Sequence, residues 1–153
     1  MTDDIIKQTI LRAPLERVWT AITDPPEFGA WFGAEWDTPF TVGETASGRM
    51  VSTIVDPDVA ASQQPFAGTP FAIHIDELEP MTRFAFRWNP SPESKTLTTV
   101  TFELAEVNGG VELTITESGF DALEPQLRET AREQNDGGWE AQTRLIARYL
   151  DAG

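Results

Sequence analysis

One pair of residues in this sequence has the types and the spacing for general acid–base chemistry. His74 is the only histidine, and Asp76 follows two residues later in an alternating stretch typical of a β-strand. Residues two apart on a strand share a face, so the carboxylate could orient the imidazole as a base. His74 alternates with Ile73 and Ile75, however, and therefore points away from the face that they occupy. We name His74 and Asp76 as the catalytic candidates and favour a surface pair over an active site.

The rest of the composition argues against most other chemistries. The chain has no cysteine, which excludes disulfides and thiolate ligands, and a single histidine cannot build a usual zinc site. Neither a phosphate-binding loop nor a serine-hydrolase elbow is present. We therefore expect no metal and no cofactor, and the sequence favours a protein that is not an enzyme. The formal net charge of -14 argues against nucleic acid and anionic membranes as partners.

The aromatic residues carry more information than the charged ones. Five Trp and nine Phe stand against one Tyr, and Phe84, Phe86 and Trp88 alternate on one face of a predicted strand. Plain core packing explains most of these rings, but a small sheet and one helix could also keep an apolar pocket among them. The candidate polar groups of such a pocket are Thr99, Thr101, Arg87 and Gln142. Arg49, Arg83 or Arg87 could pair with an anionic ligand, although pairing with surface acids is the simpler interpretation.

The order of predicted elements gives the fold class. Apolar periodicity predicts a first strand over 5–12, a helix over 14–24, and a second short helix that carries Phe28, Trp31 and Phe32. A strand-rich region and a C-terminal helix follow; the predicted strands are 45–56, 71–78, 83–88, 96–107 and 111–118, with 57–70 as a loop. This order predicts one α+β domain over residues 1–153. It consists of a curved antiparallel sheet of about six strands around a long C-terminal helix.

Gly137 and Gly138 interrupt the helical pattern of the C-terminal segment. Either the two glycines break the segment into two helices, or one helix continues and the glycines allow close backbone approach to the sheet. We favour one continuous helix, because Leu127, Ala131 and Trp139 keep a helical register across the glycines.

Three segments resemble a known superfamily when they are taken together and in this order. They are "APLERVWTAITDPPEFGAWF", "IDELEPMTRFAFRW", and "ESGF" followed by "GGWEAQTRLIARYL". The chain resembles the SRPBCC (START or Bet v 1-like) superfamily, and within it the AHSA1-like branch related to the activator of Hsp90 ATPase. The resemblance implies the helix-grip fold, with a hydrophobic cavity between the sheet and the C-terminal helix. By position it implicates Trp31, Phe32, Trp36, Phe71, Trp88 and Trp139 in ligand binding, and Thr101 and Gln142 complete the expected set.

Three functions follow as hypotheses. The first is a protein that binds a small apolar or aromatic molecule without catalysis. The second is a polyketide cyclase or aromatase-like enzyme, for which His74 and Asp76 would be the candidates. The third is an activator of an Hsp90-type chaperone ATPase, a role whose name-giving members carry a further N-terminal domain that this sequence does not show. A cytoplasmic location is expected, because the N-terminus is unlike a secretory signal. An edge strand could also pair with a second copy to form a homodimer.

Overall fold

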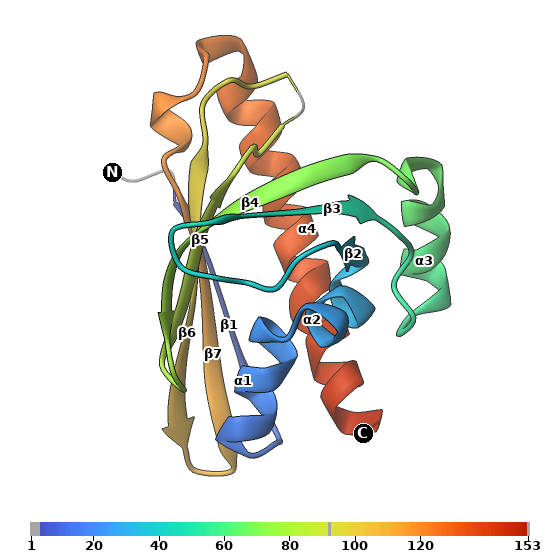
Figure 1. The fold of residues 1–153 in the computed structure, drawn as a ribbon, viewed down its shortest axis with the longest axis vertical. Coiled ribbons are helices and arrows are strands. Elements are labelled where there is room, and N and C mark those ends of the chain that lie inside the picture. Colours follow the sequence, from blue (N-terminus) through green and yellow to red (C-terminus); the bar gives the residue numbers. More distant parts are fainter. Residues whose placement is uncertain (1–3, 92, 153) are drawn as a thin grey trace.

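The computed structural model describes residues 4–91 and 93–152 and has the predicted α+β architecture (Figure 1). Within these residues, seven antiparallel strands form one curved sheet in the order β1-β7-β6-β5-β4-β3-β2. The strands are β1 (Ile5–Leu11), β2 (Ala34–Trp36), β3 (Thr45–Met50), β4 (Pro70–Glu79), β5 (Arg83–Trp88), β6 (Thr98–Val107) and β7 (Gly110–Ser118). The long helix α4 (Pro125–Ala152) packs on one face of the sheet, and α1 (Leu15–Thr23) and α2 (Pro25–Phe32) lie beside it. A short 3-10 turn, η2 (Phe120–Ala122), leads from β7 towards α4.

The junction between α1 and α2 explains the position of both helices. Asp24 accepts a hydrogen bond from the backbone N–H of Glu27 at 3.3 Å and so caps the start of α2. Pro25 and Pro26 fill the first positions of α2, where a missing N–H costs nothing. The same Asp-Pro-Pro stretch therefore ends one helix and begins the next, as the sequence predicted for the end of α1.

The region between β3 and β4 differs from the prediction. The strand expected over 45–56 ends at Met50, and the segment expected as a loop contains α3 (Pro57–Gln63) and the 3-10 turn η1 (Gln64–Phe66). Asp56 caps α3 by accepting from the N–H groups of Asp58 and Val59 at 2.8 and 3.2 Å. None of the residues of α3 is buried, so the helix shows no apolar period that a sequence reading could detect. The short strand β2, which pairs with β3, was also not predicted.

The helix α4 is continuous across Gly137 and Gly138, as predicted. The reason given for the glycines is wrong, because a Cβ added at either position would meet no atom within 4 Å. Close backbone approach occurs instead at Gly29 in α2, where an added Cβ would lie 2.0 Å from the carbonyl oxygen of Ala34. Of these two helices, packing therefore requires the glycine in the short one and not those in the long one.

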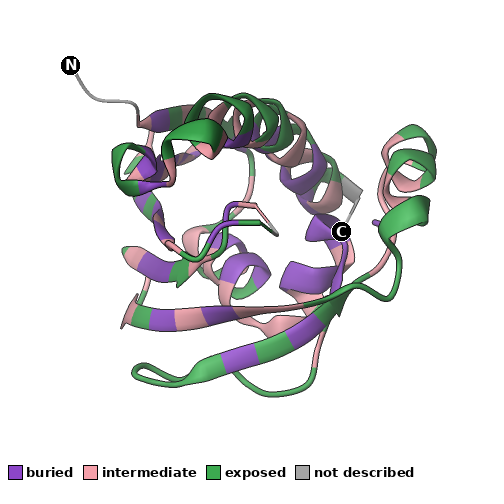
Figure 2. Cartoon of the chain, turned by 90° about the horizontal axis from the view of Figure 1, so that it is seen from above, coloured by how far each residue is buried: buried purple, intermediate pink, exposed green. Residues whose placement is uncertain are grey.

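Several phenylalanine rings lie in the core between the sheet and the helices. Figure 2 shows buried and exposed residues alternating along the strands, so that one face of the sheet supplies the core. The ring of Phe28 stacks on that of Phe102 with centroids 6.0 Å apart, and Phe40 stacks on Phe84 at 5.5 Å. In this part of the core the rings therefore pack directly against one another. None of the described helices combines the length and the apolar character needed to cross a bilayer.

Candidate functional site

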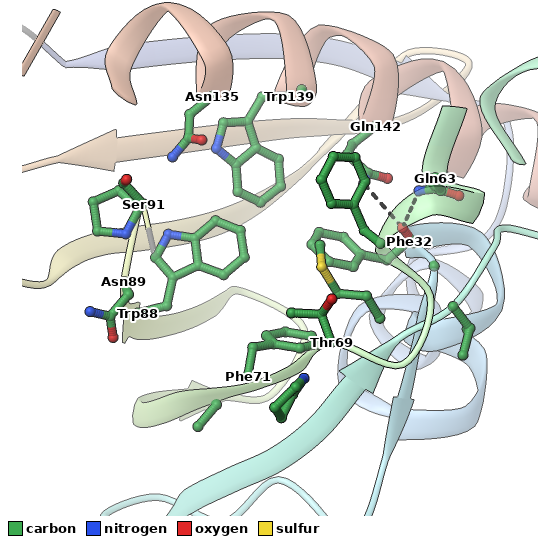
Figure 3. A pocket seen from close by; sticks show the side chains of 18 residues that line it. Phe32, Gln63, Thr69, Phe71, Trp88, Asn89, Ser91, Asn135, Trp139 and Gln142 are labelled. Atoms are coloured by element: carbon green, nitrogen blue, oxygen red, sulfur yellow. Dashed lines mark hydrogen bonds between the residues drawn. The ribbon is translucent and has the colours of Figure 1, made fainter. Parts of the chain in front are cut away.

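A pocket of about 640 Å³ lies between α4, the end of α2 and the ends of strands β3, β4 and β5 (Figure 3). Side chains from α3 and η1 form its remaining side. The lining residues are Phe32, Gly33, Met50, Val51, Gln63, Phe66, Thr69, Pro70, Phe71, Ala72, Trp88, Asn89, Pro90, Ser91, Asn135, Gly138, Trp139 and Gln142. Its volume is in the range of sites that hold a small organic molecule.

Three aromatic rings line the pocket and also contact phenylalanine rings of the core. The indoles of Trp88 and Trp139 lie with centroids 5.7 Å apart and an interplanar angle of 31°. The ring of Phe32 lies 6.1 Å from each of them. Phe71 contributes a further ring from the start of β4, across the pocket from Trp139 in Figure 3. Such a wall offers ring faces and ring edges to a bound molecule, which suits contact with another aromatic ring.

A buried carboxylate holds this wall in place. Glu117 in β7 has no exposed surface. Its Oε1 accepts a hydrogen bond of 2.8 Å from the indole N–H of Trp139, and its Oε2 accepts one of 3.0 Å from the indole N–H of Trp88. The hydroxyl of Thr98 donates to Oε2 at 2.5 Å, and the amide of Asn135 donates to both oxygens at 3.0 and 3.1 Å. An ionised carboxylate only accepts hydrogen bonds, and these four side chains supply it with donors.

Glu117 was missed by the sequence analysis, although a signal was present. On β7 the residues Val111, Leu113, Ile115 and Glu117 are buried at every second position, so the predicted strand over 111–118 already placed this carboxylate inward. A buried carboxylate costs several kcal/mol unless it is fully hydrogen-bonded. We find no basic side chain paired with it among the described residues, so the four neutral donors offset that cost.

The polar groups on the other side of the pocket converge on one backbone carbonyl. The side-chain amides of Gln63 and Gln142 donate to the carbonyl oxygen of Phe32 at 3.2 and 3.1 Å (Figure 3). Gln63 also accepts from the backbone N–H of Thr53 at 2.7 Å, which attaches α3 to the body of the protein. The carbonyl Oε1 of Gln142 is buried and has no hydrogen-bond partner among the described residues.

The structure brings five of the eight expected ligand-binding residues to the pocket: Phe32, Phe71, Trp88, Trp139 and Gln142. Trp31 lies apart from it in the core, fully buried, where its indole N–H donates to the carbonyl oxygen of Ala21 at 2.9 Å and ties α2 to α1.

The remaining two expected residues also lie away from the pocket lining. Trp36 packs its ring against Phe71 and Phe40, with centroid distances of 5.0 and 5.2 Å, on the core side of Phe71. Thr101 faces the opposite side of the sheet from Phe102, because successive strand residues point to opposite faces. Thr99 and Arg87, which pair in register on neighbouring strands, share that outer face with Thr101.

The catalytic candidates His74 and Asp76 also lie outside the pocket. Ile73 and Ile75 are buried, and His74 points to the other face, where its Nδ1 forms a hydrogen bond of 2.7 Å with the hydroxyl of Thr45. Asp76 lies at a β-bulge and binds Arg87 with distances of 2.9 and 3.2 Å instead of orienting His74. A cyclase-like reaction in the pocket would therefore lack the base that these two residues were expected to supply.

The arginines that could have received an anionic ligand are engaged on the surface. Arg49 pairs with Glu35 and Asp37, at 2.7 and 3.2 Å. Arg83 pairs with Glu77 and Glu103, at 3.2 and 3.4 Å. Within residues 4–91 and 93–152, no group of three or more His, Cys, Asp or Glu is placed to hold a metal ion. The chemistry of the site is therefore that of an uncharged, largely aromatic pocket.

Solved structures of the same fold include proteins from several bacteria. DynU16, a protein in the dynemicin biosynthetic locus, shares 26% identity with a TM-score of 0.73 over 99% of this chain, which spans only 48% of DynU16. Protein MLL2253 from Mesorhizobium loti is 20% identical with a TM-score of 0.74, and 97% of each chain is covered. A protein from Arthrobacter aurescens is 17% identical with a TM-score of 0.75, over 99% of this chain and 88% of that one.

Among curated proteins, none matches the chain. The model of one family, described as activator of Hsp90 ATPase homolog 1-like protein, does match it, over residues 12–151. With that match and the helix-grip arrangement of sheet and helix, the chain belongs to the AHSA1-like family of the SRPBCC superfamily.

Proposed function

We propose that this protein binds a neutral, largely apolar aromatic molecule in the pocket between α4 and the sheet. The observation that carries the proposal is the lining of the pocket: Phe32, Phe71, Trp88 and Trp139 supply aromatic surface, and none of the described side chains in the lining is charged. A ligand with a carboxylate or phosphate would lose its hydration there without gaining a cation, so a neutral molecule is favoured.

The lack of a base in the pocket supports binding over catalysis. His74 and Asp76 interact with Thr45 and Arg87 on the outer face of the sheet. Glu117 is the carboxylate that holds the pocket wall. Its two oxygens accept hydrogen bonds from four side chains, so it is not placed to act as a base in the pocket.

Two neighbouring glycines provide a matched test of the proposed site. Gly138 lines the pocket and Gly137 does not, yet both are exposed positions of α4 at which an added Cβ meets no atom. A leucine at position 138 would extend into the pocket, whereas a leucine at position 137 would leave it open.

The probes are 2-naphthol, which is neutral, and 2-naphthoate, which has the same rings and a charge. Calorimetric titration is expected to show binding of 2-naphthol to the wild type and to Gly137→Leu, and loss of binding to Gly138→Leu. Thermal shift should follow the same order, and 2-naphthoate should bind much more weakly. Equal binding to both leucine variants would place the ligand elsewhere, and no binding of 2-naphthol to the wild type would remove the proposal.

A further inference from the structure

The pocket has two ends, and the two indoles occupy only one of them. Figure 3 shows Trp88 and Trp139 on one side of the pocket and Gln63 and Thr69 on the other. The pocket volume of about 640 Å³ falls in the range that accommodates a drug-sized molecule. A small ring system stacked on the indoles would therefore leave the second end, at Gln63 and Thr69, unfilled.

The second end carries two exposed apolar side chains. Met50 at the end of β3 and Phe66 in η1 both line the pocket, and they are 38% and 58% exposed. Their backbones meet at Thr69. Its carbonyl oxygen accepts from the N–H of Met50 at 2.8 Å, and its own N–H donates to the carbonyl oxygen of Phe66 at 3.1 Å. Both side chains therefore belong to the end of the pocket at which Thr69 lies.

The exposure of these two side chains is informative because of where it occurs. The large apolar residues that are exposed in the described part of the chain are Ile6, Ile10, Val42, Met50, Ile54 and Phe66. Single exposed apolar residues are common on protein surfaces and need no explanation. Met50 and Phe66, however, border one pocket whose other end is aromatic. A molecule that ends at the indoles leaves both side chains in water, whereas a longer apolar molecule covers them.

We propose that the ligand is elongated: its aromatic head lies against Trp88 and Trp139, and an apolar tail runs over Met50 and Phe66 towards solvent. The tail is uncharged, because none of the described side chains in the lining could pair with a charge. Burial of the two exposed side chains by the tail contributes to affinity. The inference rests on the proposed function and adds the length of the ligand and the character of its tail.

Two phenols measure the contribution of the tail. 4-Ethylphenol and 4-hexylphenol share an aromatic head that is neutral below pH of about 10, and they differ by four methylenes. Each methylene that is fully removed from water improves affinity about fourfold. A tail that is covered on one side gains less. For the wild type, calorimetry is expected to give a dissociation constant for 4-hexylphenol about tenfold or more below that for 4-ethylphenol.

Three variants test where the tail lies. Phe66→Ser and Met50→Ser each remove apolar surface from the second end of the pocket, so each should reduce the preference for 4-hexylphenol to about threefold. Ile54→Ser is the matched control, because Ile54 is 76% exposed in the same region of the chain but does not belong to the pocket lining. It should keep the preference of the wild type. The readout is the ratio of the two dissociation constants within each variant, so a general change in stability or in binding of the head does not affect it.

The outcomes are distinct. A preference that falls in Phe66→Ser and Met50→Ser and persists in Ile54→Ser supports the inference. Equal binding of the two phenols to the wild type, or an unchanged preference in both pocket variants, overturns the inference and leaves the proposed function intact. Binding of 2-naphthol without binding of 4-hexylphenol has the same meaning. Failure of 2-naphthol and of both phenols to bind overturns the inference and the proposed function together.

Discussion

The indole N–H of Trp139 in α4 donates a hydrogen bond of 2.8 Å to Oε1 of Glu117 in β7. The contact joins the long helix to the sheet at the pocket wall. It also belongs to a network in which one buried carboxylate serves four donors from β5, β6 and α4. The position of both indoles therefore depends on a single acidic side chain.

Replacing Glu117 by Gln is expected to lower the free energy of unfolding by about 1–3 kcal/mol, because an amide has one acceptor oxygen and leaves at least one buried indole N–H unpaired. Glu117→Ala should cost more, since it removes both acceptors and leaves a cavity. Urea unfolding followed by tryptophan fluorescence measures both changes.

Glu112→Gln is the control for this network. Glu112 is on the same strand but alternates with the buried residues and points to the outer face. Its replacement should change the free energy of unfolding by less than about 0.5 kcal/mol. An equal effect of the two Gln variants would contradict the role assigned to Glu117.

The glycines of α2 and α4 are expected to respond in opposite directions to the same substitution. Gly137→Ala should raise the free energy of unfolding by about 0.5–1 kcal/mol, because alanine favours the helix and its Cβ meets no atom. Gly29→Ala should lower it by about 3 kcal/mol or more, since the Cβ would lie 2.0 Å from the carbonyl oxygen of Ala34 and the backbone must shift. Thermal and urea unfolding of the pair provide the test, and a stable Gly29→Ala would show that α2 and β2 do not approach as described.

Tyr149 is expected to make the stability depend on pH in the alkaline range. Its hydroxyl donates to Glu27 at 2.8 Å, and burial, followed by this hydrogen bond, raises the pKa of Tyr149 above its ordinary value. The unfolded chain then releases the phenolic proton first. The contribution of this group to stability is complete below pH of about 10 and is lost as the pH rises through the higher pKa of the folded state.

Tyr149 is the only tyrosine, so phenolate absorbance reports this residue alone. The titration midpoint should be higher in the native protein than in denaturant. Tyr149→Phe should remove the corresponding part of the alkaline loss of stability. A native midpoint at or below the denatured one would be incompatible with the contact to Glu27.

The sequence by itself was enough to determine the types and the order of most elements. Apolar alternation in β4, β5 and β7 and the helical register in α4 are local patterns, and they are visible because each of these elements buries one face. The helix α3 buries no side chain and β2 has only three residues, so neither produced a pattern that could be detected. Thr101 is a different case, because the sequence pattern was present but was not applied. Its alternation with Phe102 already placed it on the outer face of the sheet, away from the expected pocket.

The tertiary structure alone decided which inward side chains meet. Glu117 lies 29 residues from Trp88 and 22 from Trp139 along the chain, and their contact depends on the register of β5, β6 and β7 and on where α4 crosses them. The same holds for Gln142 and Phe32, which are 110 residues apart. The apolar periodicity of a strand or helix specifies the face on which a side chain lies. Only the packing of whole elements against one another brings donors and acceptors within hydrogen-bonding distance, and the pocket wall is held by such contacts.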